Sequence, residues 1–286
     1  MSPGRRPPRR PPAPRGRGGN GRPPARGRPP GEERGSPRKS LGGEQVEGRH
    51  AVRELLLAGR RRTKDIWLAE DVDDAPILGD ILELAEELRV PVRRVPRTQL
   101  EAAARSEAPQ GILAHAAPLP EAELDTLCRS RPGEPAPFLV GFDGITDPQN
   151  LGALLRTAVG AGATGALLPR HRSATVTPTV AKAAAGAVEH LPIALVGGLP
   201  AALARAKDLG VWVVGLDETG DTTLFDLPLG PEPVVLVLGA EGAGLGRLTR
   251  ARCDVVAAIP LRGPLASLNV AAAGALACFE IARRRP

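Results

Sequence analysis

The chain has 286 residues, of which 42% are hydrophobic and 2% aromatic, and its formal net charge is +6. This length is enough for one large domain or two modest ones with hydrophobic cores. No stretch reaches the roughly 18 to 20 apolar residues that cross a bilayer, and the N-terminus lacks the apolar core of a secretory signal. The sequence therefore argues against a membrane or exported protein, and we expect a cytoplasmic one.

Residues 1–40 differ sharply in composition from the rest of the chain. They hold 12 of the 38 Lys and Arg residues, 11 of the 31 prolines and only 2 of the 32 acidic residues. The other 26 basic and 30 acidic residues leave a charge of about −4 on the remainder. Arg in a Pro and Gly background cannot bury apolar surface, so we predict a disordered basic tail that is attracted to phosphate backbones.

Residues 41–118 are predicted to form a small α/β domain. Its first helix, 48–59, places apolar side chains on one face and ends at Gly59. Asp73 or Asp74 is expected to cap the second helix. The other expected elements are strands at 64–71, 90–95 and 111–117 and a helix near 98–104. Residues 119–136, rich in proline and charge, are predicted to be an interdomain linker.

From residue 137 to 286, apolar strands alternate with helices. Continuous Val and Leu runs separated by helices predict a parallel sheet that is covered on both faces, with ligands at the carboxyl ends of its strands. The expected strands are 137–143, 165–169, 192–196, 211–217, 234–241 and 255–261. The expected helices are 151–161, 179–188, 200–209, 245–252 and 268–284.

One glycine pattern in this region imitates a dinucleotide-binding turn. Gly160, Gly162 and Gly165 form a literal G-x-G-x-x-G, but a helix precedes them and a strand follows. The fingerprint requires the reverse order and an acidic residue about 20 positions on, which is missing here. We therefore interpret Gly160 and Gly162 as a helix stop, and the pattern argues against an NAD-dependent oxidoreductase.

Three other segments carry more polar residues than structure alone demands. In the first, a turn delivers Asn150 and the following apolar helix carries Arg156. Asn150 can equally be a helix cap, and Arg156 a solvated helix charge. In the second, a buried strand runs into a glycine loop that contains Glu241, which argues for a ligand without phosphates, or for one held through ribose and adenine.

The third segment, residues 259–285, contains a strand end, a loop and the C-terminal helix. Ser267 or Asn269 is expected to cap this helix, which is apolar until its terminal arginines. A helix that is apolar all round is buried, either inside a domain or at a subunit interface. The terminal arginines favour the negative end of the helix dipole.

Together the segments read N-x-x-x-x-x-R, L-G-A-E-G-x-G-L and I-P-L-x-G-x-x-x-S-L-N-V. In this order they resemble the three motifs of the SpoU (TrmH-like) ribose 2′-O-methyltransferases of the SPOUT superfamily, over residues 138–285. The small domain, through GRHAVRELL and PQGILA, resembles that family's RNA substrate-binding domain, which is similar to a ribosomal-protein fold. The combination resembles the RlmB-type branch, which methylates a guanosine of large-subunit ribosomal RNA.

The resemblance implies a specific architecture and cofactor. The catalytic domain would be a SPOUT-type parallel sheet with a C-terminal deep trefoil knot, a rare exception to unknotted chains. S-adenosylmethionine would be held mostly by backbone at Gly239, Ile259 and Leu268, with Leu238 and Leu261 packing its adenine. The partner would be ribosomal RNA, and the family's homodimers fit an interface role for the apolar C-terminal helix.

The resemblance also implies five catalytic residues, namely Arg156, Asn150, Glu241, Ser267 and Asn269. The arginine is proposed as the base in this family, but a guanidine with a pKa above about 12 is a poor base at neutral pH. We prefer that Arg156 grips the target phosphate and stabilises the developing alkoxide, while the other four order the site. Pro264, Ala266 and Ala271 depart from the family pattern at positions where polar residues are common.

Several alternatives remain at the level of sequence. A transfer-RNA or antibiotic-resistance ribosomal RNA methyltransferase of the same family fits the motifs as well, and the small domain and tail argue only weakly against it. A non-catalytic RNA-binding assembly factor fits less well, because all five polar residues are intact. The scarcity of aromatic residues suggests that RNA is recognised through its shape and phosphates.

Cysteine and histidine spacing bounds the remaining chemistry. Cys128, Cys253 and Cys278 lack the spacing of metal ligands, and the four histidines are scattered along the chain. We therefore predict no metal site and interpret the cysteines as buried thiols in a reducing cytoplasm.

Overall fold

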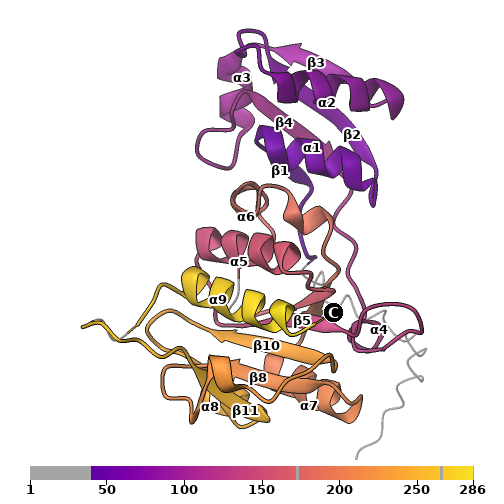
Figure 1. Ribbon diagram of the computed structural model, residues 1–286. Coiled ribbons are helices and arrows are strands. Elements are labelled where there is room, and N and C mark those ends of the chain that lie inside the picture. The colour runs from indigo at the N-terminus through magenta and orange to yellow at the C-terminus, as the bar shows by residue number, and fades with distance from the viewer. Residues whose placement is uncertain (1–39, 172–173, 265–266, 286) are drawn as a thin grey trace, which may run out of the picture. The chain divides into compact units, whose positions relative to one another are not determined.

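The computed structural model describes residues 40–171, 174–264 and 267–285 (Figure 1). All but Ser40 of the expected basic tail lies outside the described residues, as does Ala266. Within the described part of the chain, no helix combines the length and the hydropathy that a membrane span requires.

The small domain is built on a four-stranded sheet in the order β1-β4-β2-β3. Its strands are β1 (Gln45–Glu47), β2 (Thr63–Ala69), β3 (Val92–Val95) and β4 (Ile112–Ala116), and its helices are α1 (Arg49–Ala58), α2 (Pro76–Glu87) and α3 (Arg97–Ala103). Only β2 and β3 are parallel. Alternate side chains of β2 point to opposite faces, so Ile66 packs under α1 and α2 while Trp67 packs under α3.

Two details of the small domain differ from the sequence prediction. Neither Asp73 nor Asp74 caps α2: the helix begins at Pro76, and its N-cap Ala75 makes no side-chain cap bond. Proline is suited to the first helical turn because its φ angle is fixed and it has no amide hydrogen to satisfy. Strand β1 was not predicted, since three residues are too few to show an alternating pattern.

Residues 119–128, the first part of the segment predicted to be a linker, pack along the edge of the second sheet. They contain the short helix α4 (Leu124–Leu127), and the amide of Ala122 donates to Ile193 O at 2.8 Å on strand β7 (Ile193–Val196). Cys128, 2% exposed, joins a core cluster beneath this sheet. This first part of the predicted linker is thus fixed to the domain that follows it, whereas residues 129–135 are exposed.

The second sheet has seven strands, all parallel, in the order β7-β6-β5-β10-β8-β11-β9. Besides β7 they are β5 (Phe138–Asp143), β6 (Gly165–Pro169), β8 (Trp212–Leu216), β9 (Thr222–Thr223), β10 (Val234–Gly239) and β11 (Val255–Ala258). The predicted α/β class and parallel sheet are confirmed. Strand β9 was missed because it has only two residues.

Helices cover both faces of this sheet, as predicted (Figure 1). On one face lie α5 (Pro148–Gly160), α6 (Pro178–Ala183) and α9 (Val270–Arg283); on the other lie α4, α7 (Leu199–Asp208) and the one-turn helix α8 (Arg247–Arg250). The helix expected over 179–188 stops early, because Ala185 and Gly186 have φ angles of 48° and 82°. A short 3-10 helix, Ala187–Glu189, follows.

The G-x-G-x-x-G segment is a helix stop, as expected. Helix α5 ends at Gly160, Gly162 has a φ of 78°, and β6 begins at Gly165. The positive φ explains the glycine, because an L side chain is strained there. The order of helix, turn and strand offers no helix N-terminus to a pyrophosphate.

The end of α9 is anchored by more than its dipole. The guanidinium of Arg285 donates to the carbonyl oxygens of Ala136 at 2.7 Å and Glu232 at 2.6 Å, and lies 5.2 Å from the ring centroid of Phe138. Arg284 donates to the carbonyl of Phe225 at 2.5 Å. The two arginines therefore tie the C-terminus to the segments that precede β5 and β10.

Candidate active site

The sheet brings the first two polar segments together. Strands β5 and β10 are neighbours, and Asp143 at the end of β5 pairs in register with Gly239 at the end of β10. Because parallel strands end at the same edge, the turn into α5 and the glycine loop after β10 emerge side by side. The loop that leads into α9 joins them through Asn269.

Three of the five predicted catalytic residues form one hydrogen-bonded chain. Asn150 Nδ2 donates to Glu241 Oε2 at 3.3 Å, and Asn269 Nδ2 donates to Asn150 Oδ1 at 3.1 Å. The three side chains come from α5, the glycine loop and the start of α9. Residues separated by more than a hundred positions thus meet at the carboxyl edge of the sheet.

Helix capping fixes the direction of this chain. Asn269 Oδ1 accepts from the amides of Ala271 at 2.8 Å and Ala272 at 3.4 Å, so Asn269 is the N-cap of α9. With its oxygen engaged, its amide nitrogen must face Asn150 Oδ1, which in turn directs Asn150 Nδ2 toward Glu241. Asn150 itself is not a cap, because Asp147 fills that role for α5.

Arg156 and Ser267 take no part in the hydrogen bonds that join Asn150, Glu241 and Asn269. Arg156 is exposed, and no hydrogen bond or ion pair joins it to another described residue. It lies about 9 Å along α5 from Asn150 and is rotated by roughly 120° around the helix axis. Ser267 is exposed in the loop before α9. Within one copy of the chain, the structure does not bring either residue to the Asn150 amide.

The glycine loop forms a closed turn whose residues 241–243 are exposed. Ala240 and Gly244 exchange two backbone hydrogen bonds of 3.1 and 2.9 Å. A Cβ at Gly239 would lie 2.3 Å from the backbone carbon of Gly244, so only glycine fits there. In the described part of the chain, the amides of residues 241–243 have no backbone acceptor. A ligand can therefore meet unsatisfied N–H groups on this turn.

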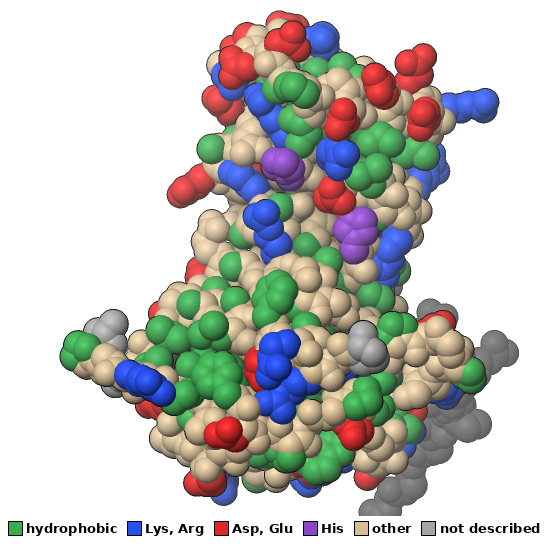
Figure 2. Space-filling view, in the orientation of Figure 1, with side chains coloured by type: hydrophobic (Ala, Val, Ile, Leu, Met, Phe, Trp, Pro, Cys, Tyr) green, Lys and Arg blue, Asp and Glu red, His purple; other side chains and the backbone are tan. Residues whose placement is uncertain are grey.

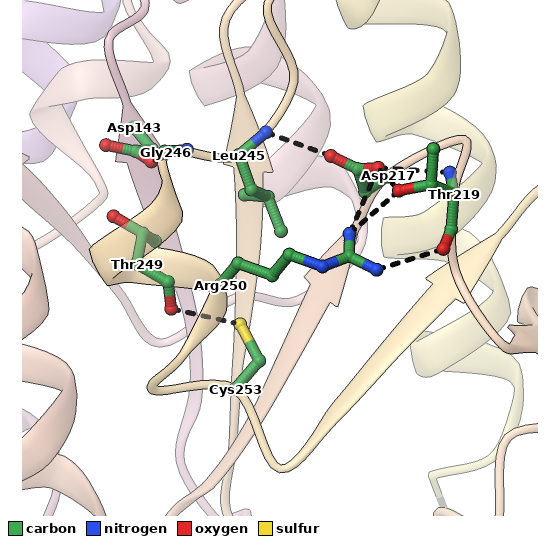
Figure 3. Close-up of polar contacts among 8 residues, drawn as sticks. All are labelled: Asp143, Asp217, Thr219, Leu245, Gly246, Thr249, Arg250 and Cys253. Atoms are coloured by element: carbon green, nitrogen blue, oxygen red, sulfur yellow. Dashed lines mark hydrogen bonds and ion pairs between the residues drawn. The ribbon is translucent and has the colours of Figure 1, made fainter.

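Two carboxylates hold the exit of this loop from opposite sides of β10 (Figure 3). Asp143 Oδ2 accepts from the amide of Gly246 at 2.8 Å, and Asp217 Oδ2 accepts from the amide of Leu245 at 3.0 Å. Burial alone raises the pKa of Asp217, but hydrogen bonds from Leu245 and Thr219 outweigh it and hold that pKa below its ordinary value. Asp217 is therefore charged at neutral pH.

Sequence reasoning missed both carboxylates as site residues. The available signal was their position, because each directly follows or ends a predicted apolar strand at the edge where ligands bind. Neither lies in a spacing pattern that points to chemistry. Their hydrogen-bond acceptors become visible only once the loop is folded against them.

The predicted cofactor residues differ in what they expose. The side chain of Leu238 is 1% exposed, and a Cβ at Gly274 of α9 would lie 3.0 Å from its Cδ1. Its side chain thus has no surface for an adenine, which leaves its backbone. Leu261 and Leu268 are 38% and 37% exposed and offer apolar surface at the two ends of their loop. Ile259 is half-buried against the core.

Burial affects all three cysteines, whose thiols are among the side chains that commonly bind metals. Burial raises the pKa of Cys128 and Cys253 to about 11 and that of Cys278 to about 12, so these thiols are protonated at neutral pH. No group of three His, Cys, Asp or Glu side chains in the described part of the chain is arranged to hold a metal ion.

Two family models match consecutive parts of the chain. Residues 45–122 match the RNA 2′-O ribose methyltransferase substrate-binding model, and residues 137–279 match the SpoU rRNA methylase family. The chain is also 42% identical to the 23S rRNA (guanosine-2′-O-)-methyltransferase RlmB of Pseudomonas aeruginosa, over 85% of this chain and 97% of that protein. The chain belongs to the SpoU rRNA methylase family.

Other relatives agree with this membership. An uncharacterized tRNA/rRNA methyltransferase of Mycobacterium marinum is 40% identical over 85% of this chain and 77% of its own length. Among solved structures, the SpoU methyltransferase AviRb of Streptomyces viridochromogenes in complex with AdoMet has a TM-score of 0.70 at 25% identity, covering 84% of this chain and 89% of its own. An AdoMet-bound rRNA methyltransferase of Sinorhizobium meliloti has a TM-score of 0.66 at 26% identity, with 84% and 86% covered.

Proposed function

We propose that this SpoU family member transfers a methyl group from S-adenosylmethionine to the ribose 2′-hydroxyl of a guanosine in 23S-type ribosomal RNA. The observation that carries the proposal is the Asn150–Glu241–Asn269 chain, which lies next to a glycine loop with unsatisfied amides. The guanosine assignment is supported by the 42% identity to the Pseudomonas aeruginosa enzyme over nearly its full length.

The cofactor would lie between the glycine loop and the loop that leads into α9. Backbone groups from Gly239 onward would bind its polar parts, and the exposed side chains of Leu261 and Leu268 would cover the adenine. Glu241 stands in this loop, so the site suits a ligand that carries no phosphate. These features fit S-adenosylmethionine, which supplies an activated methyl group when it is bound.

We also propose that residues 259–285 pass through the preceding loop as a deep trefoil knot. What supports it is the course of the chain: after β11, helix α9 returns to pack against β10 and α5, where Gly274 contacts Leu238 and Leu154. A knot additionally requires the chain to pass through an earlier loop before it reaches α9, and the return of α9 over β10 supports that course. The arginine anchors at Arg284 and Arg285 would hold the threaded end in place.

The protein's contribution to the reaction is alignment and charge stabilisation. The 2′-oxygen must approach the methyl carbon in line with the methyl–sulfur bond, which breaks as the new C–O bond forms. The 2′-hydroxyl must lose its proton in the same reaction. Asn150 and Asn269, fixed by the α9 cap, would orient the ribose, and Glu241 would order the amide chain. Arg156 does not reach these side chains within one copy, so Arg156 of a second copy, at the border of the proposed homodimer, would bind the adjacent phosphate and stabilise negative charge on the 2′-oxygen.

A second copy of the chain is the proposed occupant of the apolar face of α9. Phe225, Leu276 and Phe279 are 48%, 44% and 55% exposed and surround a hollow of about 370 Å³. Hydrophobic side chains are visible on this face in Figure 2. A Cβ at Gly160 would lie 3.9 Å from Phe279, and Arg156 precedes Gly160 by one helical turn. A homodimer formed here would therefore have Arg156 at its border.

RNA binding would be divided between the small domain and the basic tail. Figure 2 shows acidic side chains gathered over the small domain, which fits the charge of about −4 outside residues 1–40. Attraction to phosphates would then come mainly from the tail, and recognition by the small domain from the shape of the RNA. We propose that the enzyme acts in the cytoplasm, where its ribosomal RNA substrate would be found.

The proposal is tested by methylation of purified RNA with labelled S-adenosylmethionine. We expect wild-type protein to modify one guanosine of 23S rRNA, mapped by mass spectrometry, and cells without the gene to lack that methyl group. Methylation of transfer RNA alone, or binding of NAD in place of S-adenosylmethionine, would overturn it. Arg156→Lys retains the charge, so near-normal turnover of this variant would contradict a bidentate role for Arg156.

A further inference from the structure

We infer that Asp217 is a positioning residue that holds the cofactor loop in its binding conformation before the cofactor arrives. The inference rests on the proposed use of S-adenosylmethionine at this loop. Asp217 lies outside all three motifs of the family, at the carboxyl end of β8. It acts on the loop through hydrogen bonds and does not itself need to touch a ligand.

Both carboxylate oxygens of Asp217 have hydrogen-bond or ion-pair partners (Figure 3). Oδ2 accepts from the amide of Leu245 at 3.0 Å. Oδ1 accepts from the amide of Thr219 at 3.0 Å and from its hydroxyl at 2.5 Å, and pairs with Arg250 Nη1 at 3.1 Å. The side chain is only 10% exposed, so these charge-assisted bonds are shielded from water.

The carboxylate also occupies the space in which the loop turns. Gly244 has a φ of 62°, and a Cβ on it would lie 2.5 Å from Asp217 Oδ2. The left-handed glycine and the carboxylate therefore fit against each other. We infer that this contact keeps the Ala240–Gly244 turn closed, which leaves the amides of residues 241–243 without a backbone acceptor in the described part of the chain.

The support for Asp217 is itself rigid. The amide of Asp217 donates to Ala257 O at 3.0 Å on β11, and a Cβ at Gly220 would lie 2.5 Å from the backbone of Ala257. Arg250 of α8 binds both the carboxylate and the carbonyl of Thr219, the latter at 2.9 Å. The turn after β8 is thus fixed to β11 on one side and to α8 on the other.

A ligand that is held by backbone amides loses affinity if those amides must first be ordered. A loop fixed in advance avoids that cost, which is the general effect of preorganisation. Without the Asp217 acceptor, the amide of Leu245 would be left without a partner and Gly244 would be free to rearrange. We therefore expect Asp217 to govern cofactor affinity more strongly than RNA affinity.

The test compares Asp217→Asn and Asp217→Ala with wild type by calorimetric titration with S-adenosylmethionine. We expect the dissociation constant to rise about tenfold or more, on the scale of one lost charge-assisted hydrogen bond. The KM for S-adenosylmethionine should rise in parallel while the KM for RNA stays unchanged. Hydrogen exchange at the Leu245 amide should accelerate in the protein without cofactor.

Asp254→Asn is the matched control. Asp254 Oδ2 accepts from the amide of Val213 at 2.9 Å, and Oδ1 pairs with Lys207 Nζ at 2.6 Å, at the opposite end of β8. This variant should lower the melting temperature without changing cofactor affinity. The inference would be overturned if Asp217→Asn bound S-adenosylmethionine with wild-type affinity. It would also be overturned if Asp217→Asn and Asp254→Asn lost the same amount of cofactor affinity. Failure of wild type to bind S-adenosylmethionine would instead overturn the proposed function.

Discussion

Asn269 caps α9 with its side-chain oxygen, and its side-chain N–H donates a hydrogen bond of 3.1 Å to Asn150 Oδ1. One amide group thus serves the stability of a helix and the orientation of a neighbouring side chain. Because the cap leaves no freedom to flip, the direction of the hydrogen bonds as far as Glu241 follows from the position of a helix terminus. The Asn269 side chain therefore links the start of the C-terminal helix directly to the orientation of Asn150.

Asn269→Asp separates these two roles. A carboxylate still caps the helix and suits its N-terminus, so we expect the melting temperature to stay near that of wild type. The variant has no N–H to donate, and it places an anion against Asn150 Oδ1. We expect kcat to fall by about 100-fold, as when one oriented donor is removed from an active site.

Thr177→Ala is the control for this prediction. Thr177 caps α6, accepting from the amide of Val180 at 3.3 Å, and is not part of the amide chain. Its loss should cost about 1 kcal/mol of stability and leave kcat unchanged. Normal turnover by Asn269→Asp would show that the Asn150 orientation does not matter to the reaction.

The sequence was most informative where its patterns are long. The parallel sheet followed from apolar strands such as β10, and the placement of Asn150 and Glu241 at one edge followed from where their strands end. The link to Asn269 was implied only by the family resemblance, because 119 positions separate it from Asn150. Asp217 had only its position after an apolar strand as a signal, since its role depends on a glycine turn that folds against it.

Prediction was also limited where one element depends on contacts with another. Ser267 and Asn269 were equal candidates for the α9 cap, and only the folded loop shows that Asn269 fills it. The helix beyond it was expected to be buried, either inside the domain or at a subunit interface, because it is apolar all round. In the structure one face packs on the sheet while Leu276 and Phe279 remain exposed. Hydropathy alone cannot distinguish a core from an unpartnered face.

A buried ion pair between Arg61 and Glu189 gives a stability prediction. Their N–O distance is 2.5 Å and their side chains are 3% and 1% exposed. Arg61→Ala leaves the Glu189 carboxylate buried without a counter-charge, and we expect the free energy of unfolding to fall by about 3 kcal/mol. Urea denaturation followed by circular dichroism measures this change.

An exposed ion pair with the same N–O distance provides the comparison for the Arg61–Glu189 pair. Arg205 and Asp125 also approach to 2.5 Å, but their side chains are 49% and 46% exposed. Water screens this pair, so Arg205→Ala should destabilise the protein much less than Arg61→Ala does. Similar losses in the two variants would mean that the Arg61 pair is solvated in solution.

Glu280 predicts a stability difference at acid pH. Its hydrogen bond from Arg283 and its contact with Arg284 lower its pKa to about 2, although burial opposes them. A glutamate in an unfolded chain titrates near about 4.3, so the folded form binds its proton less readily. The stability that the Glu280 carboxylate contributes is therefore complete above a pH of about 4.3 and is lost as the pH falls toward 2.

Glu280→Gln should remove this acid dependence. We expect the variant to be less stable than wild type at pH 6 by on the order of 1 kcal/mol, since Arg283 is largely exposed and screened. The two stabilities should converge between about pH 4 and pH 2, measured by urea midpoints. Glu134→Gln, from an exposed pair with Arg131, should show no such convergence. A constant difference across this range would rule out the assigned role.

The apolar face of α9 gives the last prediction, which concerns assembly. Phe279, 55% exposed, lies on that face, and a charge placed there would be buried unpaired if a second copy covered it. We therefore expect Phe279→Glu to convert a dimeric wild type to a monomer in sedimentation at micromolar concentration. Leu57→Glu, at a side chain 46% exposed on α1, should leave the dimer intact. A dimer that survives Phe279→Glu would exclude this face as the interface, whereas a monomer whose circular dichroism matches wild type would show that the charge acts on association and not on folding.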